Sequence, residues 1–184
     1  MGDARLRVGF DATSLLGPRT GVGNVVSHLL ETLAARDDLD ITAFAVTLRG
    51  RGALRHQTPH NVKTRTRHIP ARLTRVLWRH FGFPRAEVWT GPVDVVHAPN
   101  YVAPPARAPI IATVHDLTFV RYPELSTPDT LTFPRYIRQA LDRGAEIHVV
   151  SDFVGAEVRD YFGVEAERVV RVYPGLVPSV GGDP

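Results

Sequence analysis

Short apolar runs alternate along this chain with segments of helical periodicity, and most of the runs end in polar residues. The strand-like runs lie at residues 6–12, 39–46, 62–69, 93–99, 109–116, 146–151 and 168–176. Among the helical segments, residues 22–33 repeat apolar side chains every three or four positions. Strands that alternate with helices predict an α/β fold with a Rossmann-like, mostly parallel sheet and helices on both faces.

Capping residues and prolines predict where several helices begin and end. Thr127 and Pro128 predict a helix start, and Pro134 kinks or restarts that helix. Asp152 is the expected cap of a later helix, which ends at Gly163.

Ligands of a parallel sheet bind beyond the carboxyl ends of its strands. The polar residues that follow the predicted strands are therefore the candidate functional groups. They lie at positions 11–23, 97–101, 115–122 and 151–152.

The composition limits the functions that the chain can have. It contains no cysteine, which excludes disulfides, thiolate catalysis and cysteine-based zinc sites. His56, His60 and His68 are close in sequence, but Pro59 and the loop around them give no fixed face for ligands, so we expect no metal site. No apolar run approaches the roughly 18 residues that a membrane span needs. We therefore expect a cytoplasmic protein.

Positive charge is concentrated in one part of the chain. Residues 49–85 contain ten lysines and arginines and no acidic residue, which leaves 12 basic and 19 acidic residues elsewhere. Such asymmetry favours an anionic partner on one face. Nucleic acid is not expected, because this region has no known reader motif and no stacking platform.

Residues 71–81 form a short basic amphipathic segment inside this region. Its apolar stripe and its basic stripe consist of Leu73, Val76, Leu77 and Phe81, and of Arg72, Arg75 and Arg79. This pattern is typical of a helix that lies on an anionic membrane surface. A helix that packs its apolar stripe in the core and leaves its arginines in water has the same pattern, so both interpretations stay open.

Two glycines precede the helical pattern at residues 22–33. A dinucleotide-binding turn needs G-x-G-x-x-G directly after the first strand, but Gly21 comes ten residues after Asp11 and no third glycine follows Gly23. The pair can bring backbone N–H groups close to an anion at a helix N-terminus. It can equally be an ordinary helix start.

Five segments in order resemble one family: "TGVGNVVSHLLETL", "DVVHAPNYVAPP", "IIATVHDLTFVRYPE", "VVSDFVGAEVRDYFGV" and "VVRVYPGL". They resemble the retaining glycosyltransferases of family 4, also called group 1, which have the GT-B fold of two Rossmann-like domains. The resemblance covers nearly the whole chain and is weakest at residues 49–88. It implies that residues 1–174 are the amino-terminal, acceptor-side domain. Residues 175–184 are then the stub of an interdomain linker, and the second domain is absent.

The resemblance also assigns roles to individual residues. Gly21, Val22 and Gly23 match the loop that approaches the donor diphosphate. His115 matches a histidine that points into the cleft near the donor sugar, and Asp116 is placed to orient it. The remaining cleft or acceptor positions are Asn24, Asn100, Tyr101 and Ser151.

The implied reaction transfers a sugar from a nucleotide sugar to an acceptor hydroxyl with retained configuration, without a metal ion or cofactor. We expect the chain to be inactive without its second domain. Two alternatives stay open: a stand-alone Rossmann-like binding module and an NAD-dependent oxidoreductase.

Overall fold

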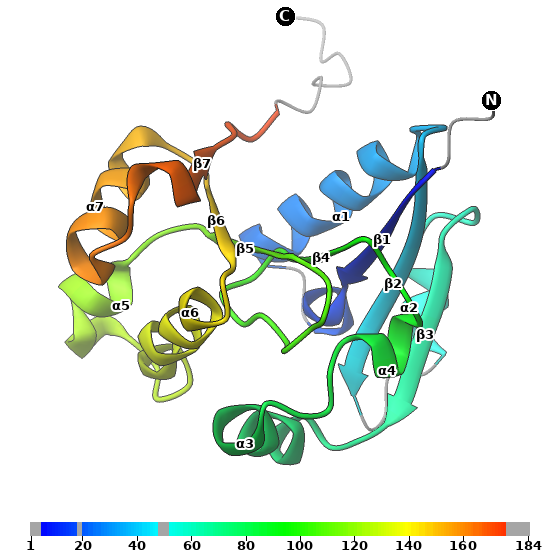
Figure 1. Cartoon of the computed structure of the whole chain (residues 1–184), viewed down its shortest axis with the longest axis horizontal. Helices are drawn as coiled ribbons and strands as arrows, with labels where there is room; N and C mark the ends of the chain where they lie inside the picture. Colours follow the sequence, from blue (N-terminus) through cyan, green and yellow to red (C-terminus); the bar gives the residue numbers. More distant parts are fainter. Residues whose placement is uncertain (1–4, 18–19, 48–51, 176–184) are drawn as a thin grey trace, which may run out of the picture.

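The computed structural model describes residues 5–17, 20–47 and 52–175, and these residues contain a seven-stranded sheet (Figure 1). Its order is β3-β2-β1-β4-β5-β6-β7, and every neighbouring pair is parallel. The strands are β1 Leu6–Asp11, β2 Leu39–Thr47, β3 Lys63–His68, β4 Val95–Ala98, β5 Ile110–Val114, β6 Glu146–Val149 and β7 Val169–Arg171. The predicted Rossmann-like α/β fold is confirmed.

Helices connect most of these strands. The α-helices are α1 Gly21–Ala34, α2 Ala53–His56, α3 Ala71–Phe81, α4 Glu87–Thr90, α5 Thr118–Arg121, α6 Phe133–Asp142 and α7 Asp152–Phe162. Short 3-10 turns lie at η1 Thr13–Leu16, η2 Pro123–Leu125, η3 Thr130–Thr132 and η4 Ala166–Arg168. No helix in the described ranges is both long enough and apolar enough to cross a membrane.

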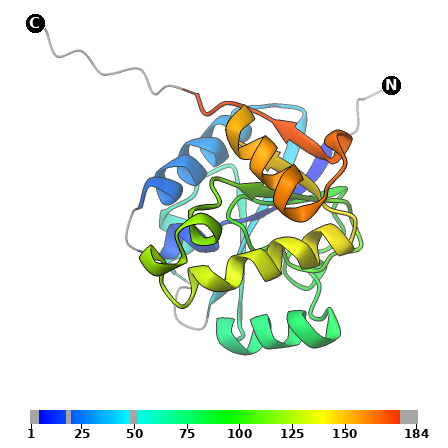
Figure 2. The ribbon, with the colours of Figure 1, turned by 90° about the vertical axis from the view of Figure 1, so that its left-hand side faces the viewer.

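The strand β2 shows how the sheet is covered on both faces. Ala43 and Ala45 pack in a cluster with Leu30 of α1, whereas Phe44 packs on the other side with Trp78 of α3. Side chains alternate between the two faces of a strand, so α1 and α3 must lie on opposite sides. Figures 1 and 2 show α6 beside α3, on the side of the sheet opposite α1, and Arg143 at the C-terminus of α6 donates a hydrogen bond to the Trp78 carbonyl of α3.

The second half of the sheet has its own core. Ile147 and Val149 of β6 are buried together with Ile137 of α6 and Val158 of α7. Ile147 and Val149 are two residues apart, so they lie on one face of β6, and α6 and α7 both cover that face. This packing holds the carboxyl ends of β4, β5 and β6 at one edge of the molecule.

Two predicted helix boundaries were wrong. The helix expected at Thr127 begins instead at Phe133, with Pro134 in its first turn, while Thr127 accepts a hydrogen bond from the Thr130 amide. Proline is favoured in a first helical turn, where its missing N–H removes no intrahelical bond. Proline therefore starts α6 and does not kink it.

The cap of α7 is Ser151 and not Asp152. Ser151 has the extended backbone that a cap requires, and its Oγ accepts a hydrogen bond from the Val154 amide at 3.2 Å. Asp152 is the first residue of the helix, and its carboxylate pairs with Arg171 at 2.8 Å.

Two other predictions cannot be compared with the structure. Arg49 and Arg51 of the basic region, and nearly all of the expected linker at 175–184, lie outside the described residues.

Candidate functional site at the carboxyl edge of the sheet

The strand order identifies where a ligand is expected. From β1 the chain builds the sheet in one direction through β2 and β3, and from β4 it builds in the other. The crevice between β1 and β4 at their carboxyl ends is the topological switch point, where open α/β sheets bind ligands. Asp11 ends β1, Pro99 follows β4 and His115 follows β5.

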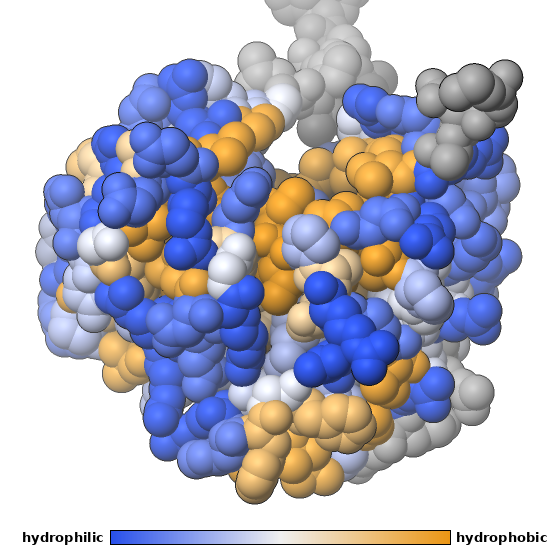
Figure 3. All heavy atoms as spheres, viewed as in Figure 1, coloured by the Kyte–Doolittle hydropathy of each residue, from blue (hydrophilic) through white to orange (hydrophobic). Residues whose placement is uncertain are grey.

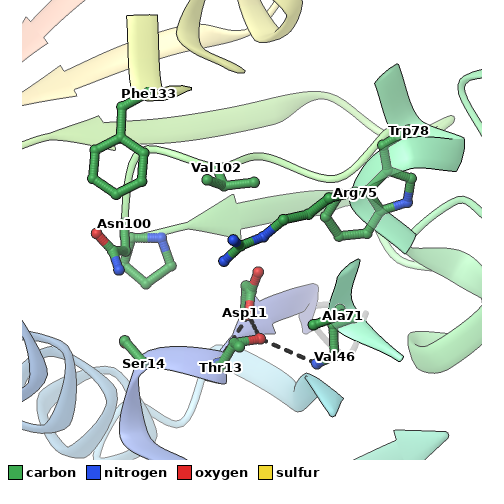
Figure 4. Close-up of a pocket in the computed structure, with 11 residues that line it drawn as sticks. Asp11, Thr13, Ser14, Val46, Ala71, Arg75, Trp78, Asn100, Val102 and Phe133 are labelled. Atoms are coloured by element: carbon green, nitrogen blue, oxygen red, sulfur yellow. Dashed lines mark hydrogen bonds between the residues drawn. The ribbon is translucent and has the colours of Figure 1, made fainter. Parts of the chain in front are cut away.

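A pocket of about 250 Å³ opens at this switch point (Figure 4). Side chains from five parts of the chain line it: the end of β1 with η1, the end of β2, the helix α3, the segment after β4, and the start of α6. Its lining includes Asp11, Thr13, Arg75, Trp78, Asn100 and Phe133. Asn100 is the lining residue to which the family resemblance assigned a role, and the other lining residues at positions 11–14 and 99 lie in the ranges predicted after strands.

Asp11 lies at the bottom of the pocket and is held by Thr13. Its Oδ1 accepts hydrogen bonds from the backbone N–H and the hydroxyl of Thr13, and the same hydroxyl accepts from the Val46 amide at 3.1 Å. Burial raises the pKa of Asp11 from 3.8 to about 6, against the opposing effects of Thr13 and of the Arg75 charge. The other oxygen, Oδ2, has no hydrogen-bond partner within the described residues.

Arg75 reaches into the same pocket from α3. Figure 4 shows its guanidinium directed toward Asp11, with Asn100 on the opposite side of the pocket from the α3 helix. It is near enough to lower the pKa of Asp11, but among the described residues it has neither a hydrogen bond nor an ion pair. Asp11 lies in the predicted candidate range 11–23 and Arg75 in the basic stripe of residues 71–81, but it was not predicted from the sequence that the two share a pocket.

His115 extends the candidate site to the next strand. Its Nε2 lies 2.9 Å from the Pro99 carbonyl oxygen. A carbonyl oxygen only accepts, so this hydrogen bond places the proton on Nε2 and leaves Nδ1 as the acceptor in the neutral ring. The ring also makes an edge contact with Tyr101, at 5.6 Å between centroids.

Asp116 holds Tyr101 and not His115, contrary to the expectation that it orients the histidine. Its Oδ2 accepts a hydrogen bond from the Tyr101 hydroxyl at 3.0 Å, and its Oδ1 accepts from the Thr118 amide at 2.9 Å. Tyr101 is only 5% exposed and stacks on Phe133 at 4.7 Å. Burial and the Asp116 charge raise the pKa of Tyr101. Tyr101 thus supports the site from within the core.

The glycines of the predicted diphosphate loop lie in the first turn of α1. Thr20 caps this helix, and its Oγ1 accepts a hydrogen bond from the Gly23 amide at 3.2 Å. The cap therefore uses the Gly23 amide, while the amides of Gly21 and Val22 have no acceptor within the described ranges. Asn24 is exposed in the same turn. The binding of a diphosphate here stays a prediction.

The hydroxyl of Ser151 caps α7, as described above. Its role in a cleft stays a prediction.

The helix α3 turns its apolar stripe outward. Leu73 and Val76 are each 51% exposed and Phe81 is 75% exposed, whereas Thr74 and Trp78 are buried against the sheet. The interpretation that this stripe packs in the core was wrong. Figure 3 shows apolar atoms gathered at the place that α3 occupies in Figure 1.

The described residues offer no evident metal site. No group of three or more His, Asp or Glu side chains within them is placed to hold a metal ion.

Comparison with known proteins agrees with this architecture. The model of a family described as Glycosyltransferase Family 4 matches residues 19–180 of the 184. A search of curated proteins finds no match. The matched range contains β2 to β7, the glycines of α1, His115 and most of the pocket. The chain belongs to glycosyltransferase family 4.

Proposed function

We propose that this chain is the amino-terminal, acceptor-side domain of a retaining glycosyltransferase of the GT-B fold. It moves a sugar from a nucleotide-sugar donor to the hydroxyl of an acceptor. The observation that carries the proposal is the match to a glycosyltransferase family over residues 19–180, in a chain whose polar side chains gather at the switch point of the sheet. The match gives no support to the oxidoreductase alternative.

In the proposed reaction the acceptor oxygen forms a bond to the anomeric carbon, and the bond from that carbon to the diphosphate breaks. The nucleoside diphosphate leaves with the electron pair, and the acceptor hydroxyl loses its proton. Stabilising the charge on the leaving group is a large part of such catalysis. The amides of Gly21 and Val22 at the N-terminus of α1 are suited to it, because they are available donors at the positive end of a helix.

His115 is the proposed contact to the donor sugar. Its hydrogen bond to the Pro99 carbonyl fixes the ring, and Nδ1 is left to meet a ligand. Asn100 offers both donor and acceptor groups to hydroxyls in the adjoining pocket. The proposal includes no metal ion or cofactor, and it requires the second domain, which holds most of the donor, for turnover.

The test is the substitution His115→Ala in the full-length enzyme, with sugar transfer measured from a panel of nucleotide sugars. We expect turnover to fall by about tenfold or more, as for the loss of one strong contact in the transition state. His28→Ala, an exposed position on α1, is the matched control and should transfer normally. Turnover near wild type in His115→Ala would contradict this role.

The exposed stripe of α3 supports a second proposal, on location. We propose that the protein is cytoplasmic and that α3 binds the anionic inner surface of a membrane. The apolar stripe of Leu73, Val76 and Phe81 is available for the lipid boundary, and the basic residues Arg72 and Arg79 flank it. No acidic residue occurs at positions 49–85 to oppose an anionic surface.

A further inference from the structure

Two opposite charges that form no ion pair with each other, Asp11 and Arg75, line the pocket at the switch point. We propose that this pocket selects an acceptor in which hydroxyl groups lie next to an anionic group: Asp11 accepts a hydrogen bond from a hydroxyl, and Arg75 binds the anion. The anion is a phosphate or a carboxylate. This inference rests on the proposed function, because it treats the pocket as the acceptor site.

Asp11 is fixed in position and has one oxygen to offer. Thr13 occupies Oδ1 with two hydrogen bonds, and the Val46 amide fixes the Thr13 hydroxyl in turn. The remaining oxygen, Oδ2, is directed into the pocket (Figure 4). Asp11 is partly buried, so its free oxygen is open to the pocket, and a sugar hydroxyl is a donor of the right size to meet it.

The guanidinium of Arg75 has no hydrogen-bond or ion-pair partner among the described residues. Its charge lowers the pKa of Asp11, yet the two form neither a hydrogen bond nor an ion pair. Both side chains line the pocket, so a ligand in it can contact both. The planar guanidinium binds phosphate or carboxylate with two parallel hydrogen bonds, which gives an anionic ligand a defined orientation.

The two charges also determine the orientation of the ligand in the pocket. The Asp11 carboxylate repels an anion, so the anionic group must lie on the side of Arg75 that faces away from it. The hydroxyls then lie at Asp11 and at Asn100. Trp78 and Phe133 form apolar walls against which the C–H face of a sugar ring can pack.

The size of the pocket limits the ligand. Its volume of about 250 Å³ is below the 300–1,000 Å³ that is usual for drug-sized ligands. A single phosphorylated or carboxylated sugar or polyol fits such a space, whereas several sugar residues do not.

The experiment measures binding to the purified chain by calorimetry at pH 7.5, without any donor. The probes are glucose 6-phosphate, glucuronate, glucose and inorganic phosphate. We expect the phosphate ester or the uronate to bind about tenfold or more tightly than glucose, and more tightly than inorganic phosphate. The stronger of the two identifies the anion.

Substitutions separate the two contacts. Arg75→Gln should remove the tenfold advantage over glucose, which corresponds to about 1.4 kcal/mol, and Arg75→Lys should restore part of it. Asp11→Asn should weaken the binding of glucose, because it changes the hydroxyl contact, and should weaken that of the phosphate ester by a smaller factor, because it also removes the repulsion between the carboxylate and the anion. Arg135→Gln, at an exposed arginine of α6 that does not line the pocket, is the control and should bind as the wild type does.

Equal affinity for glucose and both anionic sugars would overturn the inference, as would an Arg75→Gln protein that binds glucose 6-phosphate normally. Binding of inorganic phosphate as tight as that of the ester would also overturn it, since the hydroxyls would then contribute nothing. Because no donor is present, these results do not depend on transfer. A full-length enzyme that transfers sugar while the chain fails these binding tests would refute this inference alone. Selective binding without transfer would refute the proposed function.

Discussion

The carboxylate of Asp11 is expected to destabilise the folded chain at neutral pH, and Asp11→Asn tests this. Burial raises its pKa from 3.8 to about 6, so the folded state holds a proton between those values that the unfolded chain has released. The free energy of unfolding therefore falls as the pH rises from about 4 to about 6. The shift corresponds to about 3 kcal/mol at pH 7.5.

Asparagine keeps an oxygen for the two Thr13 hydrogen bonds and carries no charge. Asp11→Asn should therefore be more stable than the wild type above pH 6, by up to about 3 kcal/mol, and equally stable near pH 4. Urea denaturation at pH 4, 5, 6 and 7.5 measures this directly. A variant that is no more stable than the wild type at pH 7.5 would refute the conclusion that burial of the charged Asp11 carboxylate destabilises the folded chain.

Asp94 provides a control, because its contribution to the free energy of unfolding should change with pH in the opposite direction. The Arg7 side chain and amide lower its pKa from 3.8 to about 2, so its contribution to stability is present above pH 3.8 and is lost as the pH falls. Asp94→Asn should accordingly destabilise the chain at pH 7.5, and the difference from the wild type should shrink towards pH 2.

Two further predictions concern the support of the site and its surroundings. Tyr101→Phe removes the donor to Asp116 and should lower the free energy of unfolding in urea by about 1–2 kcal/mol. Tyr161→Phe, at a half-exposed tyrosine, should lower it by less than about 0.5 kcal/mol. Equal effects of the two substitutions would contradict the role of Tyr101. Leu73→Ser should reduce co-sedimentation with anionic vesicles at low salt, whereas Leu125→Ser, at another exposed leucine, should not. If the wild type does not bind such vesicles at low salt, the membrane proposal is wrong.

The sequence predicts the sheet well because burial on two faces leaves a clear pattern. The strand β2 is apolar on both sides, and its predicted range of 39–46 agrees with Leu39–Thr47 in the structure. The start of α1 is also predicted from the sequence, because an apolar stripe follows Gly23. Local signals of this kind do not depend on distant residues.

The orientation of α3 could not be predicted in this way. Its stripe of Leu73 and Val76 satisfies the pattern of a core helix, but Trp78 is larger and packs with Phe44 and Trp89, so it takes the buried side. Which side of an amphipathic helix meets the sheet depends on the cavity that the rest of the chain leaves. No local pattern contains that information.

The candidate site was predicted only in part, because some of its contacts join segments that are distant in the sequence. His115 and Asn100 follow strands, and the rule that ligands bind at the carboxyl edge of a sheet selects them. Asp11 lies in the predicted range 11–23, but its position beside Arg75 was not predicted, because it depends on a helix that packs over the end of a distant strand. The partner of Asp116 was likewise set by the buried position of Tyr101, which the sequence does not reveal.

The most direct test of the central claim is the reaction itself. The full-length enzyme is incubated with a panel of nucleotide sugars and anionic sugar acceptors, and the anomeric configuration of the product is read by NMR. The account predicts a glycoside with the configuration of the donor, formed at a rate that falls in His115→Ala and Arg75→Gln. A product of inverted configuration would contradict the proposed retaining mechanism, and the absence of transfer from every donor would contradict the assignment of this domain as the acceptor side of a glycosyltransferase.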